Sequence, residues 1–445
     1  MNRVKLSVDN LNSGEYVAAL DRPWSDTPFF IEGFFISNDR QIEQLKQCCR
    51  HVYIDPSKRT GESQKDIWTS DKNTALAIDS QVPPLSSDTA GYHLMTEGVE
   101  APLDSYYDFP HAGQHPSSSA IEDELITAGN CYKNLGRELG LLVGCVVKSE
   151  HYDFSRLITT IGQMVDSCLR NSDALLWHTK HKTPSNYMFG HCMDVAALLA
   201  YVGCYLGYEK GTLIHMAMGG LLMDIGKIRM DKVLHIKSSP LSSEEKSSAR
   251  EHVENTREIL ASQDFEFHPI VRDIAFNHHE RFDGSGYPVG KHGQSNSAMV
   301  YFAGIADAYD SMCSTRLYQP NIMAPSEVIH SMYAWRDTQF PAELVDLFIQ
   351  CVGYYPTSSL VKLNSGAIAA VVAQNPRAKL KPKIVVVKNS VGGNEELPRV
   401  VDLSDAVLDL RVADADFTPA DEGLSYADLY ITSEKMEQLL LAPQH

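Results

Sequence analysis

Between Ser119 and about Gln350, apolar residues recur at intervals of three and four in one segment after another. The pattern is clear in ELITAGNCYKNLGRELGLLVGCV, FSRLITTIGQMVDSCLRNSDALLW, GHCMDVAALLAYVGCYLG and VRDIAFNHHERF. This spacing gathers apolar side chains on one face of a helix, and such faces are stable only when they pack together. We therefore predict a mainly α fold whose body is a bundle of helices.

The flanking segments have different patterns. VKLSV, EYVAAL, FFIEGFFI and HVYID are short β-type runs, and residues 39–49 have a helical pattern. After Pro356, SLVKLNSGAIAAVVAQN and KPKIVVV predict strands around an Asn-Ser-Gly turn. The predicted organisation is a small α+β domain at 1–66, a flexible linker at 67–118, the helical domain at 119–355, a short β segment at 356–390 that closes this domain, and an acidic tail at 391–445.

Charge and composition limit the partners. The chain has 39 Lys and Arg against 57 Asp and Glu, a formal charge of −18, which argues against binding long nucleic acid through its phosphates. A small anionic ligand stays open if cations gather locally. The nine cysteines include no CxxC pair, which is typical of reduced thiols in a cytoplasmic protein. The sequence has no signal-like start and no run of about 18 apolar residues, so we expect no membrane span.

Metal-binding residue types recur on separate predicted helices. They are His191, Asp224 in GGLLMDIGKI, His252, the pair His278 and His279, and Asp307 in GIADAYD. Buried charged groups need partners, and these positions lie among Ala, Leu, Ile and Gly. Neighbouring helical residues point about 100° apart, so the histidine pair is expected to reach two adjacent ions, which Asp224 can bridge. The pattern predicts a two-metal centre of the phosphoesterase kind.

A turn follows the histidine pair directly. In ERFDGSGYPVG, Gly284 and Gly286 are expected to end the helix and to bring Tyr287 and Pro288 close to the metal helix. By itself DGSGYP is an ordinary turn. Beside HHE it predicts a tyrosine at the rim of a metal site that can stack on a base.

The stretch FNHHERFDGSGYPVG, with DIGKI upstream and GIADAYDSMCSTRLY downstream, resembles the HD-GYP family of HD phosphohydrolases, which hydrolyse the bacterial second messenger cyclic di-GMP. The resemblance runs from about Gly190 to Val387. LDRPWSDTPFFIEGFFISNDRQIEQL also resembles a small domain of unknown function that often precedes HD-GYP in proteobacteria. The resemblance implies an HD-type helical bundle and a cyclic di-GMP phosphodiesterase that yields pGpG, GMP or both.

The resemblance also assigns roles to residues. It implies two divalent ions, Fe or Mn, held by His191, Asp224, His252, His278, His279 and Asp307. Lys227 matches a lysine that contacts phosphate and aids catalysis beside Asp224, and Arg316 matches an arginine that grips a ligand phosphate. Gly286, Tyr287 and Pro288 form the loop near the guanine. A protein partner for the N-terminal domain and a homodimer stay open.

Three positions depart from the family pattern. Met223 replaces the His of the HD pair, and a thioether is a poor ligand for hard Fe or Mn ions. Tyr187 stands where trinuclear members carry a glutamate, which argues against a third metal, and Gln319 replaces a basic residue of some members. The readings that stay open are an enzyme of reduced activity, a degenerate cyclic di-GMP sensor or scaffold, and an HD hydrolase for another nucleotide. Met223 as a simple core residue is compatible with the first two.

Overall fold

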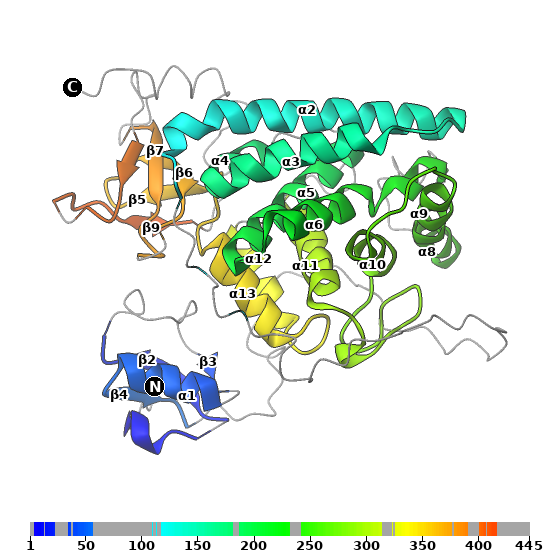
Figure 1. Ribbon diagram of the computed structural model, residues 1–445. Helices are drawn as coiled ribbons and strands as arrows, with labels where there is room; N and C mark the ends of the chain where they lie inside the picture. The colour runs from blue at the N-terminus through cyan, green and yellow to red at the C-terminus, as the bar shows by residue number, and fades with distance from the viewer. Residues whose placement is uncertain are drawn as a thin grey trace. The chain divides into compact units, whose positions relative to one another are not determined.

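The computed structural model describes residues 4–12, 14–22, 34–36, 39–56, 109, 113, 117–180, 187–231, 242–313, 323, 325–375, 378–389, 400–405 and 407–415 (Figure 1). The chain divides into two compact units, residues 1–96 and 97–445.

The first unit is a small α+β domain. Among its described residues, an antiparallel sheet of order β1-β4-β2-β3 is joined by one α-helix. Val17, Ile36, Leu45 and Val52 are buried in its core. The elements are β1 (Val4–Ser7), η1 (Val8–Asn10), β2 (Tyr16–Leu20), β3 (Phe34–Phe35), α1 (Asp39–Cys48) and β4 (His51–Ile54). The predicted α+β fold is confirmed, although most of FFIEGFFI lies outside the described residues.

The second unit is mainly helical, as predicted. Its longest helix, α2, lies beside α3, while α5 and α6 pack against each other in the interior (Figure 1). The elements are α2 (Ile121–Lys148), α3 (Phe154–Arg170), α4 (Ser172–Trp177), η5 (His178–Lys180), α5 (Tyr187–Leu206), α6 (Lys210–Leu222), η7 (Ile225–Arg229), α8 (Ser243–Arg250), α9 (His252–Ala261), α10 (Pro269–Asn277), η8 (Gly293–Ser295), α11 (Ala298–Cys313), α12 (Pro325–Ala334) and α13 (Ala342–Val352).

Helices α5 and α6 form the centre of this body because small residues let them approach closely. A Cβ atom at Gly220 of α6 would lie 2.8 Å from Leu199 Cδ1 of α5, so a larger side chain would push the helices apart. One window among the described helices, Phe189–Leu206 of α5, is long and apolar enough to cross a membrane, and 83% of it is buried inside the body. Such burial is what a core helix shows.

A five-stranded antiparallel sheet of order β8-β7-β6-β5-β9 follows the helices. Its strands are β5 (Leu360–Leu363), β6 (Ile368–Ala373), β7 (Lys383–Lys388), β8 (Val400–Asp402) and β9 (Val412–Asp414). One face packs on the start of α2 and on α4, where Ile121 and Trp177 share a core with Ile368 and Val372. The prediction of a tail from residue 391 is wrong at β8 and β9, because these strands pair with β7 and β5.

Candidate metal centre

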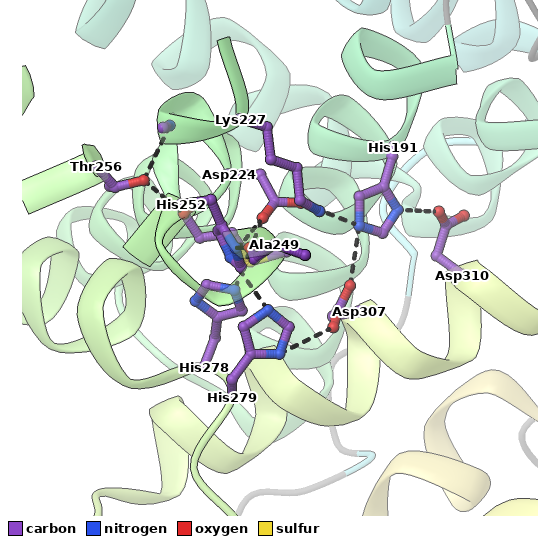
Figure 2. A network of polar contacts seen from close by, with 12 residues as sticks. His191, Asp224, Lys227, Ala249, His252, Thr256, His278, His279, Asp307 and Asp310 are labelled. Atoms are coloured by element: carbon purple, nitrogen blue, oxygen red, sulfur yellow. Dashed lines mark hydrogen bonds and ion pairs between the residues drawn. The ribbon is translucent and has the colours of Figure 1, made fainter. Parts of the chain in front are cut away.

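Six side chains that the sequence singled out converge inside the helical body (Figure 2). They come from α5, the α6–η7 turn, the start of α9, the end of α10 and α11. Their donor atoms form two groups, each with all atoms within 4.8 Å of one another. We call His191, Asp224 and Asp307 the three-donor cluster, and Asp224, His252, His278 and His279 the four-donor cluster. Their roles as ligands stay predictions.

Asp224 lies in the turn where one helix ends and the next begins. The sequence suggested one helix through GGLLMDIGKI, but α6 ends at Leu222 and the 3-10 helix η7 starts at Ile225. The Thr256 hydroxyl fixes this turn, because it donates to the Met223 carbonyl at 3.1 Å and accepts from the Gly226 amide at 3.0 Å. A Cβ atom at Gly226 would lie 2.0 Å from the His252 carbonyl oxygen, so η7 can pack on α9 only with glycine there.

Two imidazoles of the four-donor cluster are held in one tautomer. His252 Nδ1 lies 2.7 Å from the Ala249 carbonyl oxygen, and His278 Nδ1 lies 3.2 Å from that of Ala275. A carbonyl can only accept, so each Nδ1 carries the proton and each Nε2 offers a lone pair to the cluster. This is the arrangement in which histidine binds a metal ion.

The four-donor cluster contains polar atoms without partners. Asp224 Oδ1 lies 3.3 Å from His252 Nε2 and 3.8 Å from His278 Nε2. Within the described part of the chain, Asp224 Oδ1 and His278 Nε2 are buried and make no hydrogen bond. Unsatisfied buried polar atoms cost free energy, and in native proteins they often mark a binding site for an ion or a water molecule. A divalent cation fits this set, because its donors are three imidazoles and a carboxylate.

Burial keeps these imidazoles neutral. It lowers the pKa of His278 to about 4, and it also lowers the pKa of His252. Burial and the two neighbouring histidines lower the pKa of His279 well below its usual value. Neutral imidazole is the form that binds metal, so the four-donor cluster is ready for a cation at neutral pH.

The three-donor cluster differs, since its groups are already paired. His191 Nε2 lies 2.9 Å from Asp307 Oδ1, and His191 Nδ1 lies 2.6 Å from Asp310 Oδ2. Burial opposes charge on His191, but its bonds to both carboxylates outweigh burial and raise its pKa. The Lys227 ammonium lies 2.5 Å from Asp224 Oδ2. Burial raises the carboxyl pKa of Asp224, but Lys227 and the histidines hold it well below its usual range.

Asp310 was not among the predicted site residues. It lies on α11 one turn after Asp307 and orients His191 from the side opposite the cluster. The signal was present in GIADAYD, where two aspartates share one helical face.

The His278 and His279 rings lie close together, and His279 Nδ1 also lies 3.9 Å from Asp307 Oδ2 of the three-donor cluster, so the prediction that the pair reaches two adjacent ions stays a prediction. Helix α10 ends at Asn277, so the helical rotation between neighbouring residues does not apply to this pair. Their ring centroids are 4.0 Å apart, and both belong to the four-donor cluster.

The GYP loop lies against this cluster. The Tyr287 ring stacks on His279 with centroids 4.5 Å apart, and the Arg250 guanidinium lies 5.1 Å from the Tyr287 ring centroid. A Cβ atom at Gly286 would lie 2.5 Å from the His279 carbonyl oxygen, which requires glycine there. The peptide bond between Tyr287 and Pro288 is cis. Gly284 and Gly286 were predicted to end the helix, but it ends earlier, at Asn277.

A buried carboxylate anchors the loop. Glu280 is 1% exposed and accepts hydrogen bonds from the amides of Val289 at 2.8 Å, Gly290 at 3.2 Å and Lys291 at 2.8 Å. Glu280 is the acidic residue of HHE and was not among the predicted site residues. Arg316 and Gln319 lie outside the described residues, as does the side chain of Tyr187.

Comparison with known proteins places this centre in a family. Residues 3–100 match the model of a domain of unknown function (DUF3391), and residues 168–344 match that of the HD domain. The chain is 26% identical to "Cyclic di-GMP phosphodiesterase PA4108" of Pseudomonas aeruginosa over 94% of this chain and 92% of that protein. The chain belongs to the HD-GYP family. Both resemblances seen in the sequence, to HD-GYP and to the small preceding domain, are confirmed.

Other relatives of this HD-GYP chain match a smaller part of it. "3'3'-cGAMP-specific phosphodiesterase 2" of Vibrio cholerae is 30% identical over 52% of this chain and 44% of its own length. "Cyclic di-GMP phosphodiesterase response regulator RpfG" of Xanthomonas campestris is 28% identical over 35% and 42%. The chain thus spans less than half of these two proteins. Among solved structures, Bd1817, an HDG"Y"P protein from Bdellovibrio bacteriovorus, has a TM-score of 0.40 and 14% identity, with 78% of this chain and 98% of that chain covered.

Proposed function

We propose that this chain is a metal-dependent phosphodiesterase that hydrolyses cyclic di-GMP to pGpG, GMP or both, with activity reduced by Met223. The observation that carries the proposal is the four-donor cluster, with its two buried unpaired atoms. The relatives named as cyclic di-GMP phosphodiesterases support this substrate, and one of them matches nearly the whole chain.

The donor set determines which ions fit. Imidazole and carboxylate suit Fe and Mn, and their combination here supports the expectation of those metals. His252, His278, His279 and Asp224 would hold one ion, and His191, Asp224 and Asp307 offer donors for another. A bound divalent ion would activate water and neutralise charge on the phosphodiester.

The chain's own residues would bind and orient the nucleotide. The Lys227 ammonium lies beside Asp224 and can pair with a phosphate oxygen. The Tyr287 ring lies between His279 and the Arg250 guanidinium, so guanine can stack on this ring only when the guanidinium moves aside, and Arg250 then adds positive charge beside the nucleotide. Asp310 fixes the orientation of His191, and Glu280 holds the loop that carries Tyr287.

The test is hydrolysis of cyclic di-GMP by the full chain, loaded anaerobically with Fe or Mn, with nucleotides separated by chromatography. We expect wild type to form pGpG or GMP and Asp224→Ala to form neither. Asp264→Ala is the matched control, because that carboxylate is exposed on the surface and should not affect cleavage. Running 3'3'-cGAMP in parallel tests the substrate assignment.

A degenerate sensor would give a different pattern. If wild type binds cyclic di-GMP and only Met223→His cleaves it, the methionine has removed catalysis and the proposal of an enzyme is wrong. A protein partner for the N-terminal unit, a homodimer and a cytoplasmic location stay predictions.

A further inference from the structure

The two clusters share Asp224 but use different oxygens of it. Oδ1 faces the four-donor cluster, where it lies 3.3 Å from His252 Nε2. Oδ2 faces the three-donor cluster, where it lies 3.6 Å from His191 Nε2 and 2.5 Å from the Lys227 ammonium. One oxygen therefore lacks a hydrogen-bond partner in the described chain, while the other is paired with a cation.

Lys227 holds its position through the backbone. In a 3-10 helix, residues three apart lie directly above one another, and the Lys227 amide donates to the Asp224 carbonyl at 3.0 Å. The ammonium therefore lies over the carboxylate of Asp224. An ammonium has three donors and no lone pair, so it cannot ligate a metal, and it repels a cation that approaches the same oxygen.

Met223 weakens the three-donor cluster further. Its side chain is completely buried next to Asp224, and a thioether is a poor ligand for a hard divalent ion. The three-donor cluster is thus left with one imidazole, while the four-donor cluster has three. Affinity for a divalent ion should differ strongly between the two.

We propose that the chain holds a single divalent ion, in the four-donor cluster, and that the Lys227 ammonium supplies the positive charge of the three-donor cluster in place of a second ion. The inference rests on the metal dependence proposed above and corrects its expectation of two ions. In this inference Lys227 pairs with the Asp224 carboxylate where a second ion would otherwise bind.

The test is metal binding by the full chain, measured without any nucleotide. Protein stripped with chelator is titrated anaerobically with Mn²⁺ in equilibrium dialysis, and bound metal is measured together with its electron paramagnetic resonance spectrum. We expect about one Mn²⁺ per wild-type chain with an uncoupled spectrum. Lys227→Met should bind about two, and the two nearby ions should give a coupled spectrum.

Control variants distinguish the loss of the Lys227 charge from a general loss of structure. Lys227→Arg keeps the charge and should stay at about one ion per chain. Lys210→Met removes a lysine that pairs with Asp166 at 2.6 Å on the surface, and it should also stay at about one. The double variant Lys227→Met with Met223→His regains a fourth donor and should bind the second ion more tightly than Lys227→Met alone.

The outcomes distinguish this inference from the proposed function. Two ions in wild type, or one ion in both Lys227→Met and the double variant, would overturn the role of Lys227 and leave a metal-dependent enzyme intact. No bound Mn²⁺ in any folded variant would overturn the metal centre as well. Circular dichroism of each variant establishes that the comparison is made on folded protein.

Discussion

Removing the Glu280 carboxylate should release the GYP loop without unfolding the helical body. Three backbone amides of the loop donate to this one buried group, at 2.8, 3.2 and 2.8 Å. After exchange with water, each such bond contributes roughly 1 kcal/mol, so Glu280→Ala should lower the free energy of loop opening by about 3 kcal/mol. Since 1.36 kcal/mol corresponds to a factor of about ten, the amides of residues 289–291 should exchange hydrogen roughly 100-fold faster.

Hydrogen exchange measured on the folded protein tests this magnitude. Glu280→Gln keeps one oxygen acceptor and should give an intermediate rate. The matched control is Asp283→Ala, because that carboxylate is exposed and accepts one bond, from the Ser285 amide at 2.9 Å. If the three amides of Glu280→Ala exchange within threefold of the wild-type rate, the carboxylate does not hold the loop and the reasoning fails.

Three further predictions concern stability, each measured by urea unfolding. Thr256→Ala removes the hydroxyl that links two buried backbone groups of the α6–η7 turn and should cost about 2 kcal/mol, whereas Thr256→Ser should cost less; equal losses would contradict this. Gly226→Ala places a Cβ atom 2.0 Å from the His252 carbonyl oxygen and should lower the free energy of unfolding by at least about 3 kcal/mol. A variant as stable as wild type would refute this prediction. Burial raises the pKa of Asp173 to about 6, so the folded chain binds this proton more tightly than the unfolded chain. As the pH rises from about 4 to about 6, the free energy of unfolding of wild type relative to Asp173→Asn should therefore fall by about 2 to 3 kcal/mol. A difference that stays constant with pH would refute this prediction.

The helical body could be predicted because the apolar spacing of its segments and the residues at their ends indicate the same helices. Segments such as FSRLITTIGQMVDSCLR have helical apolar spacing, and α3 begins with an Asp153 cap that accepts from the Ser155 amide. The two late strands β8 and β9 could not be predicted in the same way. Each has three residues in an acidic stretch, and each exists because a neighbouring strand offers free backbone groups.

The residue types of the candidate site could be predicted from the sequence, but their division into the three-donor and four-donor clusters could not. Which residues carry imidazole or carboxylate is a matter of type and spacing. Where each atom points depends on helix ends, since α10 stops just before His278 and α6 stops just before Met223. Sequence periodicity locates such ends only to within a few residues, and one residue rotates a helical side chain by about 100°. Glu280 was overlooked for a related reason, because its partners are backbone amides that have no sequence signature.

The same helix end explains why Met223 can be tolerated. The backbone of this turn is fixed by groups that do not depend on the side chain at position 223: the Thr256 hydroxyl holds the Met223 carbonyl and the Gly226 amide, and the Met223 amide donates to Gly219. In the proposed enzyme, the missing imidazole at this position would remove a metal donor, while Asp224 would keep its place between Lys227 and His252. Because these bonds involve only backbone groups at position 223, we expect Met223→His to keep the turn in place, and its metal content then tests whether an added imidazole supplies a donor.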